Sequence, residues 1–314
     1  MNEKVELSVC VVCYNQEKYI AECLESLVSQ ETNFKFEIIV GEDCSTDNTR
    51  IIVQQYVDRY PHLIRPIFYR KNVGAVENIK QVYTSAKGKY IAHMDGDDLA
   101  LPNKLQKQFD ALENNTECVM CTHDMKLTDE NNKSYKRSFK QHNKSINSLY
   151  DLYESLPFFA HSSKVFINNI TDDFWTNFTN ETIDIEIHVK QAKKGKIFHL
   201  NEELGVYRHS VGMSVKKNKV NPLLPNATRR IFEEALIDSN GDYQKINDYY
   251  AKSIFNYAYQ SAIQGDKIGL VDYINESIAI TVFSKKQVIF YKLSKSPALV
   301  INICRLRAYL VKFK

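Results

Sequence analysis

The sequence of 314 residues predicts an α/β fold, in which a mostly parallel sheet has helices on both faces and is followed by a helical C-terminal extension. Two observations lead to this prediction. Short apolar runs alternate with segments of helical periodicity through the first two-thirds of the chain, as in parallel sheets connected by helices. Beyond Gly212 the strand pattern fades and helical periodicity remains.

Apolar runs bounded by polar turns are expected to form the strands. They comprise residues 7–12, 36–40, 67–69, 90–94 and 119–127. The helices expected between them comprise residues 17–30, 51–60, 75–86 and 104–113. In the first of these helices, Ile20, Leu24 and Leu27 recur at helical spacing. Thr46 or Asp47 is expected to cap the second helix.

The remaining pattern is less regular. Residues 129–148 are polar and basic without a clear period, so we expect a loop there. The α/β pattern resumes over residues 158–167 and 183–207. Three later helices are expected at residues 226–237, 243–264 and 268–280. We therefore expect one α/β domain, residues 1–212, and one helical extension, residues 213–314.

Composition narrows the functional class. The chain has 44% hydrophobic and 25% charged residues, which is typical of globular proteins, and its net charge of +3 is too small to predict nucleic-acid binding. From Ser284 onward there are eight Lys or Arg residues and no Asp or Glu. Within residues 297–314, Leu299, Ile303 and Leu306 have near-helical spacing. This basic amphipathic segment is expected either to lie on an anionic membrane surface or to pack on the protein body.

The N-terminal residues lack the pattern of a signal peptide, and no apolar run reaches the ~20 residues that span a bilayer. We expect a cytoplasmic protein, with peripheral contact at the inner face of the plasma membrane if residues 297–314 lie on the bilayer rather than on the protein body. The seven cysteines are expected to be reduced. Cys10/Cys13 and Cys118/Cys121 have zinc-like spacing, but residues three apart on a strand point to opposite faces.

Polar residues follow several of the predicted strands. They include Tyr14, Asp43, Asn72 and the acidic cluster at residues 95–98. The carboxyl ends of parallel strands converge on one crevice, so we expect these residues to share a ligand site.

The acidic cluster contains Asp95, Asp97 and Asp98 within four residues. Carboxylates this close repel one another unless a cation holds them together, and hard cations prefer carboxylate oxygen. Mg²⁺ or Mn²⁺ is therefore predicted, with an ordinary turn as the alternative. Neither a Walker loop nor a G-x-G-x-x-G fingerprint is present, which disfavours an ATPase or a dehydrogenase. The remaining candidate ligand is a nucleoside diphosphate that is bound mainly through the metal ion.

Several motifs occur in the order found in one enzyme family. They are residues 9–15, 38–49, 72–74 with Asn78, 86–92, 95–98 with Pro102, 183–184, 192–197 and 206–209. With them, the chain resembles the inverting family 2 glycosyltransferases of the GT-A fold, of the type that builds bacterial surface polysaccharides such as capsule or O-antigen. The resemblance covers about two-thirds of the chain.

The resemblance implies transfer of a hexosyl or N-acetylhexosaminyl group from a nucleotide-sugar, commonly a UDP-sugar, to a hydroxyl of a glycan or lipid-linked acceptor. It implies that Asp43 contacts the nucleotide base and that Tyr14 lines the base pocket, with a core aromatic as the alternative for Tyr14. Asn72 is expected to bind the donor or to build a turn. Asp97 is expected to coordinate Mn²⁺ or Mg²⁺, with Asp95 and Asp98 as further metal or sugar ligands.

Inverting transfer also needs a base for the acceptor proton. The resemblance places Asp184 in this role, although its neighbour is Ile183 where the family often has an acid. Glu181 and Glu186 are the fallback candidates, and a carboxylate that only stabilises a helix start is the structural alternative. His209 is expected near the diphosphate, where it would stabilise the leaving group. Residues 161–163 are expected at the acceptor side.

Three alternatives stay open. A catalytically silent module could bind a nucleotide-sugar without transferring it. A metal-dependent phosphatase usually carries its Asp-x-Asp motif on the first strand. A nucleotidyltransferase usually has a glycine-rich loop near the N-terminus, which this sequence lacks.

Overall fold

A computed structural model describes residues 4–139, 142–209, 218–239 and 241–312. They form two compact units, residues 1–149 with 157–212 and residues 150–156 with 213–314. The boundary predicted between residues 212 and 213 lies outside the described residues. The second unit includes residues 150–156, which the sequence pattern assigned to the first domain.

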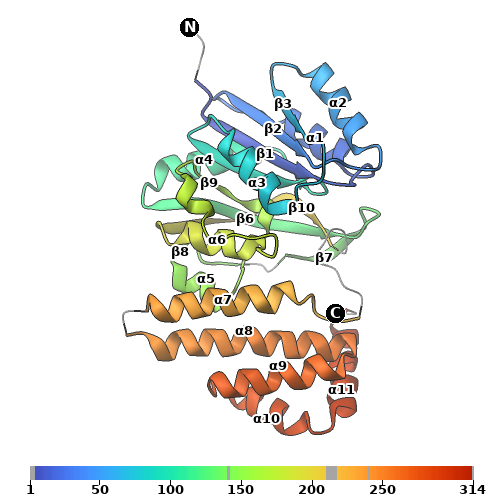
Figure 1. The fold of residues 1–314 in the computed structure, drawn as a ribbon, viewed down its shortest axis with the longest axis vertical. Helices are drawn as coiled ribbons and strands as arrows, with labels where there is room; N and C mark the ends of the chain where they lie inside the picture. The colour runs from blue at the N-terminus through green and yellow to red at the C-terminus, as the bar shows by residue number, and fades with distance from the viewer. Residues whose placement is uncertain (1–3, 140–141, 210–217, 240, 313–314) are drawn as a thin grey trace. The chain divides into compact units, whose positions relative to one another are not determined.

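The first unit is built on one sheet, whose order is β3-β2-β1-β4-β9-β6-β10-β5, with β7 paired to β6 and β8 to β10 (Figure 1). The strands are β1 (Leu7–Cys13), β2 (Phe36–Glu42), β3 (Ile64–Phe68), β4 (Tyr90–Asp95), β5 (Leu99–Ala100), β6 (Cys118–Thr128), β7 (Ser134–Ser138), β8 (Ile146–Asn147), β9 (Val165–Ile167) and β10 (Lys196–Arg208). β3, β2, β1 and β4 are mutually parallel, as are β6 and β10, whereas β9 is antiparallel to β4 and β6. The predicted mostly parallel sheet is therefore confirmed.

Helices connect these strands. They are α1 (Ile20–Val28), α2 (Thr49–Arg59), α3 (Ala75–Thr84), α4 (Lys104–Asn114) and α6 (Asp184–Ala192), with short 3₁₀ turns η1 (His161–Ser163) and η2 (Asp172–Trp175). Successive residues of a strand point to opposite faces, and Leu7 through Val11 of β1 are all buried. Both faces of the central strands are thus covered, which explains their continuous apolar sequence.

Two local expectations were wrong and a third was confirmed in part. The segment 129–148 contains β7 and β8, which are stabilised by short pairings to β6 and β10 rather than by their own sequence pattern. α2 begins at Thr49 after Asn48, and Asp47 Oδ1 accepts the backbone N–H of Thr49 at 3.0 Å, so Asp47 rather than Thr46 caps the start of the helix. β3 lies at Ile64–Phe68 rather than 67–69, because this half-buried strand carries Arg65 and Pro66 and shows no apolar run.

The second unit consists of helices: α5 (Leu149–Glu154), α7 (Leu223–Ile237), α8 (Tyr243–Gln264), α9 (Lys267–Ile280), α10 (Lys285–Leu293) and α11 (Pro297–Lys312) (Figure 1). α8 has the predicted bounds, since Gly265 adopts φ 86° and ends the helix in the left-handed region that favours glycine. Arg229 of α7 forms two hydrogen bonds to Glu276 of α9, 2.8 and 2.7 Å long.

The basic tail is helical, and one side of it packs within the second unit. Val300, Ile301 and Cys304 of α11 are buried in a cluster with residues of α8, α9 and α10. Leu299, Ile303 and Leu306 are exposed instead. Among the described residues, every helix is too short or too polar to cross a bilayer.

The cysteines are all free thiols, as expected. Six are buried and Cys44 is half-buried. Within the described part of the chain, no cysteine belongs to a group that could hold a metal ion.

Candidate functional site

The candidate site lies where the central parallel strands end. Val12 of β1 is in register with Asp95 of β4, and Cys13 pairs with Glu42 of β2. The loops that follow these three strands therefore leave the sheet at one edge. They carry Tyr14, Asp43 and the acidic cluster, as the sequence pattern predicts.

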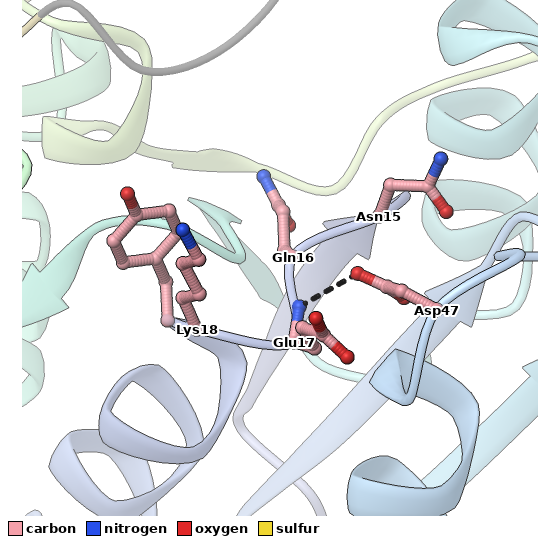
Figure 2. Close-up of a pocket in the computed structure, with 6 residues that line it drawn as sticks. Asn15, Gln16, Glu17, Lys18 and Asp47 are labelled. Carbon is pink, nitrogen blue, oxygen red and sulfur yellow. Dashed lines mark hydrogen bonds between the residues drawn. The ribbon is translucent and has the colours of Figure 1, made fainter.

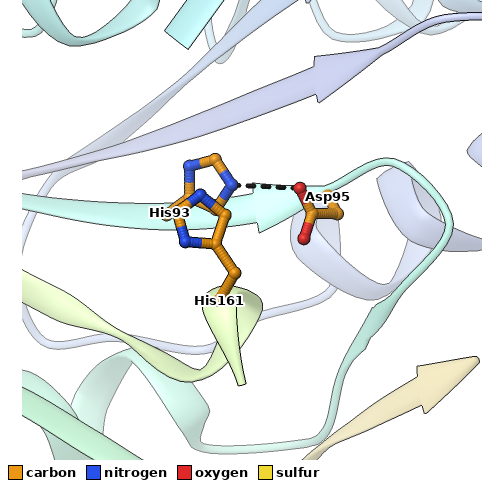
Figure 3. Close-up of side chains that lie close together, drawn as sticks. All are labelled: His93, Asp95 and His161. Carbon is orange, nitrogen blue, oxygen red and sulfur yellow. Dashed lines mark hydrogen bonds and ion pairs between the residues drawn. The ribbon is translucent and has the colours of Figure 1, made fainter. Parts of the chain in front are cut away.

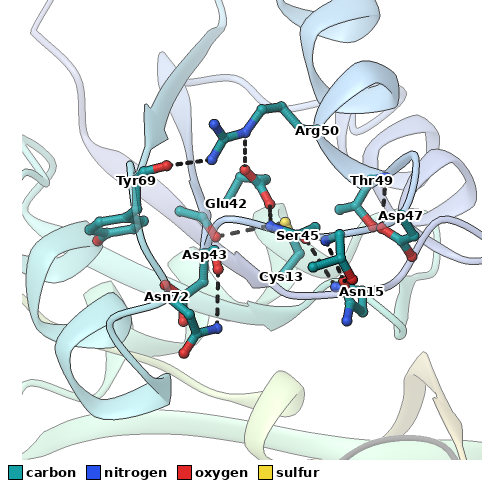
Figure 4. Close-up of polar contacts among 12 residues, drawn as sticks. Cys13, Asn15, Glu42, Asp43, Ser45, Asp47, Thr49, Arg50, Tyr69 and Asn72 are labelled. Atoms are coloured by element: carbon teal, nitrogen blue, oxygen red, sulfur yellow. Dashed lines mark hydrogen bonds and ion pairs between the residues drawn. The ribbon is translucent and has the colours of Figure 1, made fainter.

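Asp43 holds the neighbouring turn in place. Its Oδ1 accepts the backbone N–H of Val73 at 2.7 Å and its Oδ2 accepts that of Gly74 at 2.9 Å. Asn72 donates its side-chain amide to the Asp43 carbonyl at 3.1 Å (Figure 4). Gly74 has φ 87°, which other residues rarely adopt. Asn72 and Gly74 thus do build a turn, and the turn is organised around the carboxylate predicted to contact the base.

The Asp43 carboxylate retains acceptor capacity beyond these two bonds, because each carboxylate oxygen has two lone pairs. Burial raises the pKa of Asp43, while the two backbone hydrogen bonds oppose that shift. The preceding Glu42 is fully buried and forms an ion pair with Arg50, which also donates to the Tyr69 carbonyl (Figure 4). The β2–α2 turn is therefore rigidly held.

Tyr14 is 43% exposed, so it is not a core aromatic. The next residue, Asn15, has φ 53° and accepts the backbone N–H of Thr46 at 2.8 Å. A small pocket of about 300 Å³ follows, lined by Asn15, Gln16, Glu17, Lys18, Tyr19 and Asp47 (Figure 2). Asp47 helps to shape it by accepting the backbone N–H of Glu17 at 3.1 Å. Tyr14 therefore stands at the edge of the site with its side chain available to a ligand.

Asp95, the first acid of the cluster, is held by protein groups. Its Oδ1 lies 3.1 Å from Nε2 of His93 (Figure 3). Its Oδ2 accepts the hydroxyl of Ser162 at 3.2 Å. The Asp95 backbone N–H in turn donates to Ser162 Oγ at 3.0 Å. These contacts fix the orientation of the carboxylate.

Asp97 and Asp98 are both buried, and their environments differ. Burial, reinforced by the Asp95 carboxylate, raises the pKa of Asp97 to about 7. The hydrogen bonds found among the described side chains include none to the Asp97 carboxylate from another residue. Asp98 accepts the backbone N–H of Arg208 at 3.1 Å through Oδ1, and its Oδ2 has no partner. Burial and the two neighbouring carboxylates also raise the pKa of Asp98. The excess of negative charge in this loop is not balanced within the loop itself.

Arg208, the last residue of β10, is hydrogen-bonded to the acidic loop, residues 95–98. Its guanidinium is fully buried and donates to the Asp97 carbonyl, to Asn132 Oδ1 at 2.9 Å and to the Glu22 carboxylate. One buried side chain thus joins the acidic loop, α1 and the β6–β7 turn. Arg208 belongs to one of the family motifs in the sequence, but stabilisation of the leaving group was predicted for the adjacent His209.

Asp184, the predicted base, is the first residue of α6. Glu186 accepts the backbone N–H of Ile183 at 2.9 Å and so serves as the helix-start carboxylate. One ligand atom each of His161, Asp184 and His188 lie within 4.8 Å of one another. Among His93, Asp95 and His161 the same limit applies. His161 therefore lies between Asp95 and Asp184, two carboxylates far apart in the sequence.

A buried cation sits near the same two carboxylates. Lys164 is fully buried and donates to Gln191 Oε1 at 3.1 Å. Burial lowers its pKa to about 7, and attraction to Asp184 and Asp95 opposes that shift. Lys164 is thus a buried basic group close to two half-buried carboxylates.

The remaining predicted residues, His209 and Glu181, do not belong to the groups that His161 forms with Asp95 and Asp184. His209 is exposed, its backbone N–H donates to the Thr128 carbonyl at 2.8 Å, and its ring contacts Tyr135 at 6.2 Å between centroids. Glu181 is exposed. His93 and Arg208 were missed as site residues, because their contacts depend on tertiary approach rather than on local spacing. Ser162, expected at the acceptor side, bonds Asp95 of the acidic cluster.

Relatives of known sequence cover parts of the chain. An uncharacterized protein of Mycobacterium tuberculosis is 34% identical over 210 residues, which are 66% of this chain and 60% of that protein. The putative glycosyltransferase EpsE of Bacillus subtilis is 38% identical over 113 residues, 36% of this chain and 40% of EpsE. The putative teichuronic acid biosynthesis glycosyltransferase TuaG of Bacillus subtilis is 35% identical over 109 residues, 35% of this chain and 42% of TuaG. The matched part of the chain thus spans 60% or less of these relatives.

Solved structures share the fold at low identity. TarS residues 1–349 of Staphylococcus aureus, in complex with UDP-GlcNAc, match with a TM-score of 0.65 and 19% identity, over 96% of this chain and 90% of that one. The mannosyltransferase PcManGT of Pyrobaculum calidifontis, in complex with GDP-Man and Mn²⁺, matches with a TM-score of 0.55 and 13% identity, over 97% and 88%. The chain has the GT-A fold.

A family model decides the classification. The model described as glycosyl transferase family 2 matches residues 8–175, which is more than half of the chain. The matched segment contains the β2–α2 turn around Asp43 and the acidic cluster. The chain belongs to glycosyl transferase family 2.

Proposed function

We propose that this protein is an inverting glycosyltransferase that moves a sugar from a nucleoside diphosphate donor to a hydroxyl of a glycan or lipid-linked acceptor in polysaccharide biosynthesis. EpsE and TuaG, both named as putative glycosyltransferases, support this class, and TuaG is named for teichuronic acid biosynthesis. UDP-GlcNAc in TarS favours a UDP-sugar over the GDP-Man bound by PcManGT, because TarS is the more similar structure.

One observation carries the proposal. Asp95 and Asp184 come from separate segments, yet each has a carboxylate oxygen within 4.8 Å of a ring nitrogen of the same residue, His161. This proximity supports the proposal, because a direct displacement needs a base close to the donor, on the face opposite the leaving group.

The residues of the acidic loop fit a divalent cation. Its three carboxylates are partly or fully buried, and the pKa values of Asp97 and Asp98 are raised, as expected for charges without a compensating cation. Oxygen-only donors suit Mn²⁺ or Mg²⁺. We assign Asp97 as the principal ligand, with Asp95 beside it. Asp98, bonded to the Arg208 backbone, supports the loop.

Each residue of the site then has a separate role in the proposed transfer. Asp43 and Tyr14 hold the nucleotide base at the β1 and β2 edge. When bound, the divalent ion neutralises charge on the diphosphate as it leaves. Asp184 accepts the acceptor proton, and His209 adds a donor near the diphosphate. Lys164 lies near both carboxylates, whose attraction partly offsets the lowering of the Lys164 pKa by burial.

Family membership favours transfer over the phosphatase and nucleotidyltransferase alternatives. A catalytically silent module is the remaining alternative, and its distinguishing property would be donor binding without transfer. The variants of Asp97 and Asp184 below separate the two functions.

We expect Asp97→Ala to lower the metal-dependent affinity for UDP at least roughly tenfold, about 1.4 kcal/mol. The substitution removes the principal metal ligand. Calorimetry of UDP binding with Mn²⁺ and with EDTA measures the effect. Asp110→Ala, at an exposed carboxylate of α4, is the matched control. Equal affinity in the wild type and the Asp97 variant under both conditions would refute the metal assignment.

We expect Asp184→Asn to reduce sugar transfer by roughly 10²–10⁴-fold, the usual contribution of general-base catalysis. UDP binding should persist, because Asp184 does not hold the donor. A radiolabelled transfer assay with calorimetry on the same sample separates the two. Glu186→Gln and Glu181→Gln serve as comparison variants. Unchanged transfer in Asp184→Asn contradicts the role of Asp184, and a loss in either Glu variant would reassign the base.

We expect Arg208→Lys to weaken Mn²⁺-dependent UDP binding although the positive charge remains. Lysine cannot reproduce the three directions in which the guanidinium donates, and each lost bond to a charged group is worth roughly 1.5–3 kcal/mol. Arg65→Lys is the matched control, since Arg65 also bonds a carboxylate, Glu37, and a carbonyl, that of Ser85. If both variants bind UDP equally well, Arg208 does not support the donor site.

We further propose that α11 contacts an anionic membrane surface. Leu299, Ile303 and Leu306 are 50%, 49% and 61% exposed, and the chain from Ser284 onward carries only positive charges. Exposed apolar side chains among cations match the interfacial region of anionic bilayers. At the bilayer surface the protein would meet a lipid-linked acceptor.

Sedimentation with phosphatidylglycerol vesicles tests this contact. We expect the wild type to bind them more strongly than phosphatidylcholine vesicles, with binding reduced by salt. The triple variant Leu299→Ser, Ile303→Ser and Leu306→Ser should bind several-fold more weakly. Ile237→Ser, at an exposed apolar residue of α7, is the control. Equal sedimentation of the triple variant and the wild type would rule the contact out.

A further inference from the structure

Three buried histidines of the first unit lie beside the carboxylates of the proposed site. They are His93 of β4, His161 of η1 and His188 of α6. His93 is fully satisfied, because Nδ1 lies 2.9 Å from the Tyr83 hydroxyl and Nε2 lies 3.1 Å from Asp95 (Figure 3). The ring of His161 lies against that of His93 at a tilt of 50°, with 3.7 Å between centroids. His161 and His188, in contrast, each have one ring nitrogen without a hydrogen-bond partner among the described residues.

His161 and His188 share a single hydrogen bond. Nδ1 of His161 lies 2.7 Å from Nε2 of His188. The remaining nitrogens, His161 Nε2 and His188 Nδ1, are buried and have no partner among the described residues. An unpaired buried polar atom costs roughly 1–3 kcal/mol. In the described structure, each of these two buried imidazoles is hydrogen-bonded only to the other ring.

A carboxylate completes the group. Asp184 lies one helical turn before His188 on α6, so both side chains emerge on the same side of the helix. One ligand atom each of His161, His188 and Asp184 lie within 4.8 Å of one another. Two imidazole nitrogens and one carboxylate oxygen form the donor set of many zinc sites that keep a fourth position open.

The protonation state of the two histidines and the distance between their nitrogens are compatible with metal binding. Burial keeps the pKa of both His161 and His188 well below the ordinary value, so the rings are neutral, as metal ligation requires. Two nitrogens bound to one tetrahedral zinc lie about 3.3 Å apart. An ion bound by His161 Nδ1 and His188 Nε2 would replace the hydrogen bond between the two rings, with these nitrogens moving apart from 2.7 Å.

We propose that His161, His188 and Asp184 bind Zn²⁺, or a similar imidazole-preferring transition metal, at a site separate from the oxygen-ligand site at Asp97. A zinc ion held there occupies the Asp184 carboxylate. If Asp184 is the base, which rests on the proposed function, bound zinc inhibits transfer. Added Mn²⁺ or Mg²⁺ does not relieve this inhibition, because hard cations do not compete well for imidazole.

Metal titration of the full chain tests the site directly. The protein is stripped with chelator, desalted and titrated with Co²⁺, whose visible absorption reports tetrahedral nitrogen and oxygen ligation, and the Co²⁺ is then displaced with Zn²⁺. We expect one ion per chain. His188→Gln and His161→Gln should each weaken Zn²⁺ binding at least roughly tenfold. Circular dichroism confirms that each variant is folded.

Matched variants locate the effect. His199→Gln alters another buried histidine, which pairs with Asp124 at 3.3 Å but belongs to no three-residue ligand group, and should leave Zn²⁺ binding unchanged. Asp97→Ala should also retain it while losing Mn²⁺-dependent UDP binding. Absence of stoichiometric Zn²⁺ binding overturns the proposal, as does wild-type affinity in both His161 and His188 variants. These readouts need no activity, so failure of the proposed transfer function would be seen separately.

Discussion

The buried guanidinium of Arg208 is the interaction on which the candidate site depends. It lies at the end of β10 and donates to the Asp97 carbonyl, to Asn132 and to Glu22, so it joins three segments that meet only in the folded chain. The Arg208 backbone N–H also binds Asp98. A loop of three carboxylates would otherwise open by mutual repulsion. Arginine suits this role because its planar fork donates in several fixed directions.

The second constraint is the placement of His161 between two carboxylates. Asp95 is oriented by His93 and Ser162, and Asp184 is positioned by the first turn of α6. The parallel strands bring the donor loop to one edge, and η1 and α6 bring the second carboxylate to the same place. In our two proposals, Asp184 is both the base of the transfer and a ligand of the zinc site formed with His161 and His188.

Much of this was predictable from the sequence. The apolar runs of β1, β2 and β4 are long because both sheet faces are buried, and α8 ends where Gly265 adopts positive φ. The segments β7 and β8 were missed, since pairing to a neighbour stabilises them rather than their own periodicity. In the site, Asp43, Asp97 and Asp184 stand out in local motifs. The supporting roles of Arg208, Ser162 and His161 come from tertiary contacts, which a single sequence does not reveal.

The anomeric configuration of the transferred sugar tests the central claim most directly. Proton NMR of the product, recorded at early times with an α-linked UDP-sugar donor, distinguishes the two outcomes. A single displacement with Asp184 as base predicts a β-linked product. An α-linked product would contradict the account, because retention requires two displacements or a different arrangement of catalytic groups.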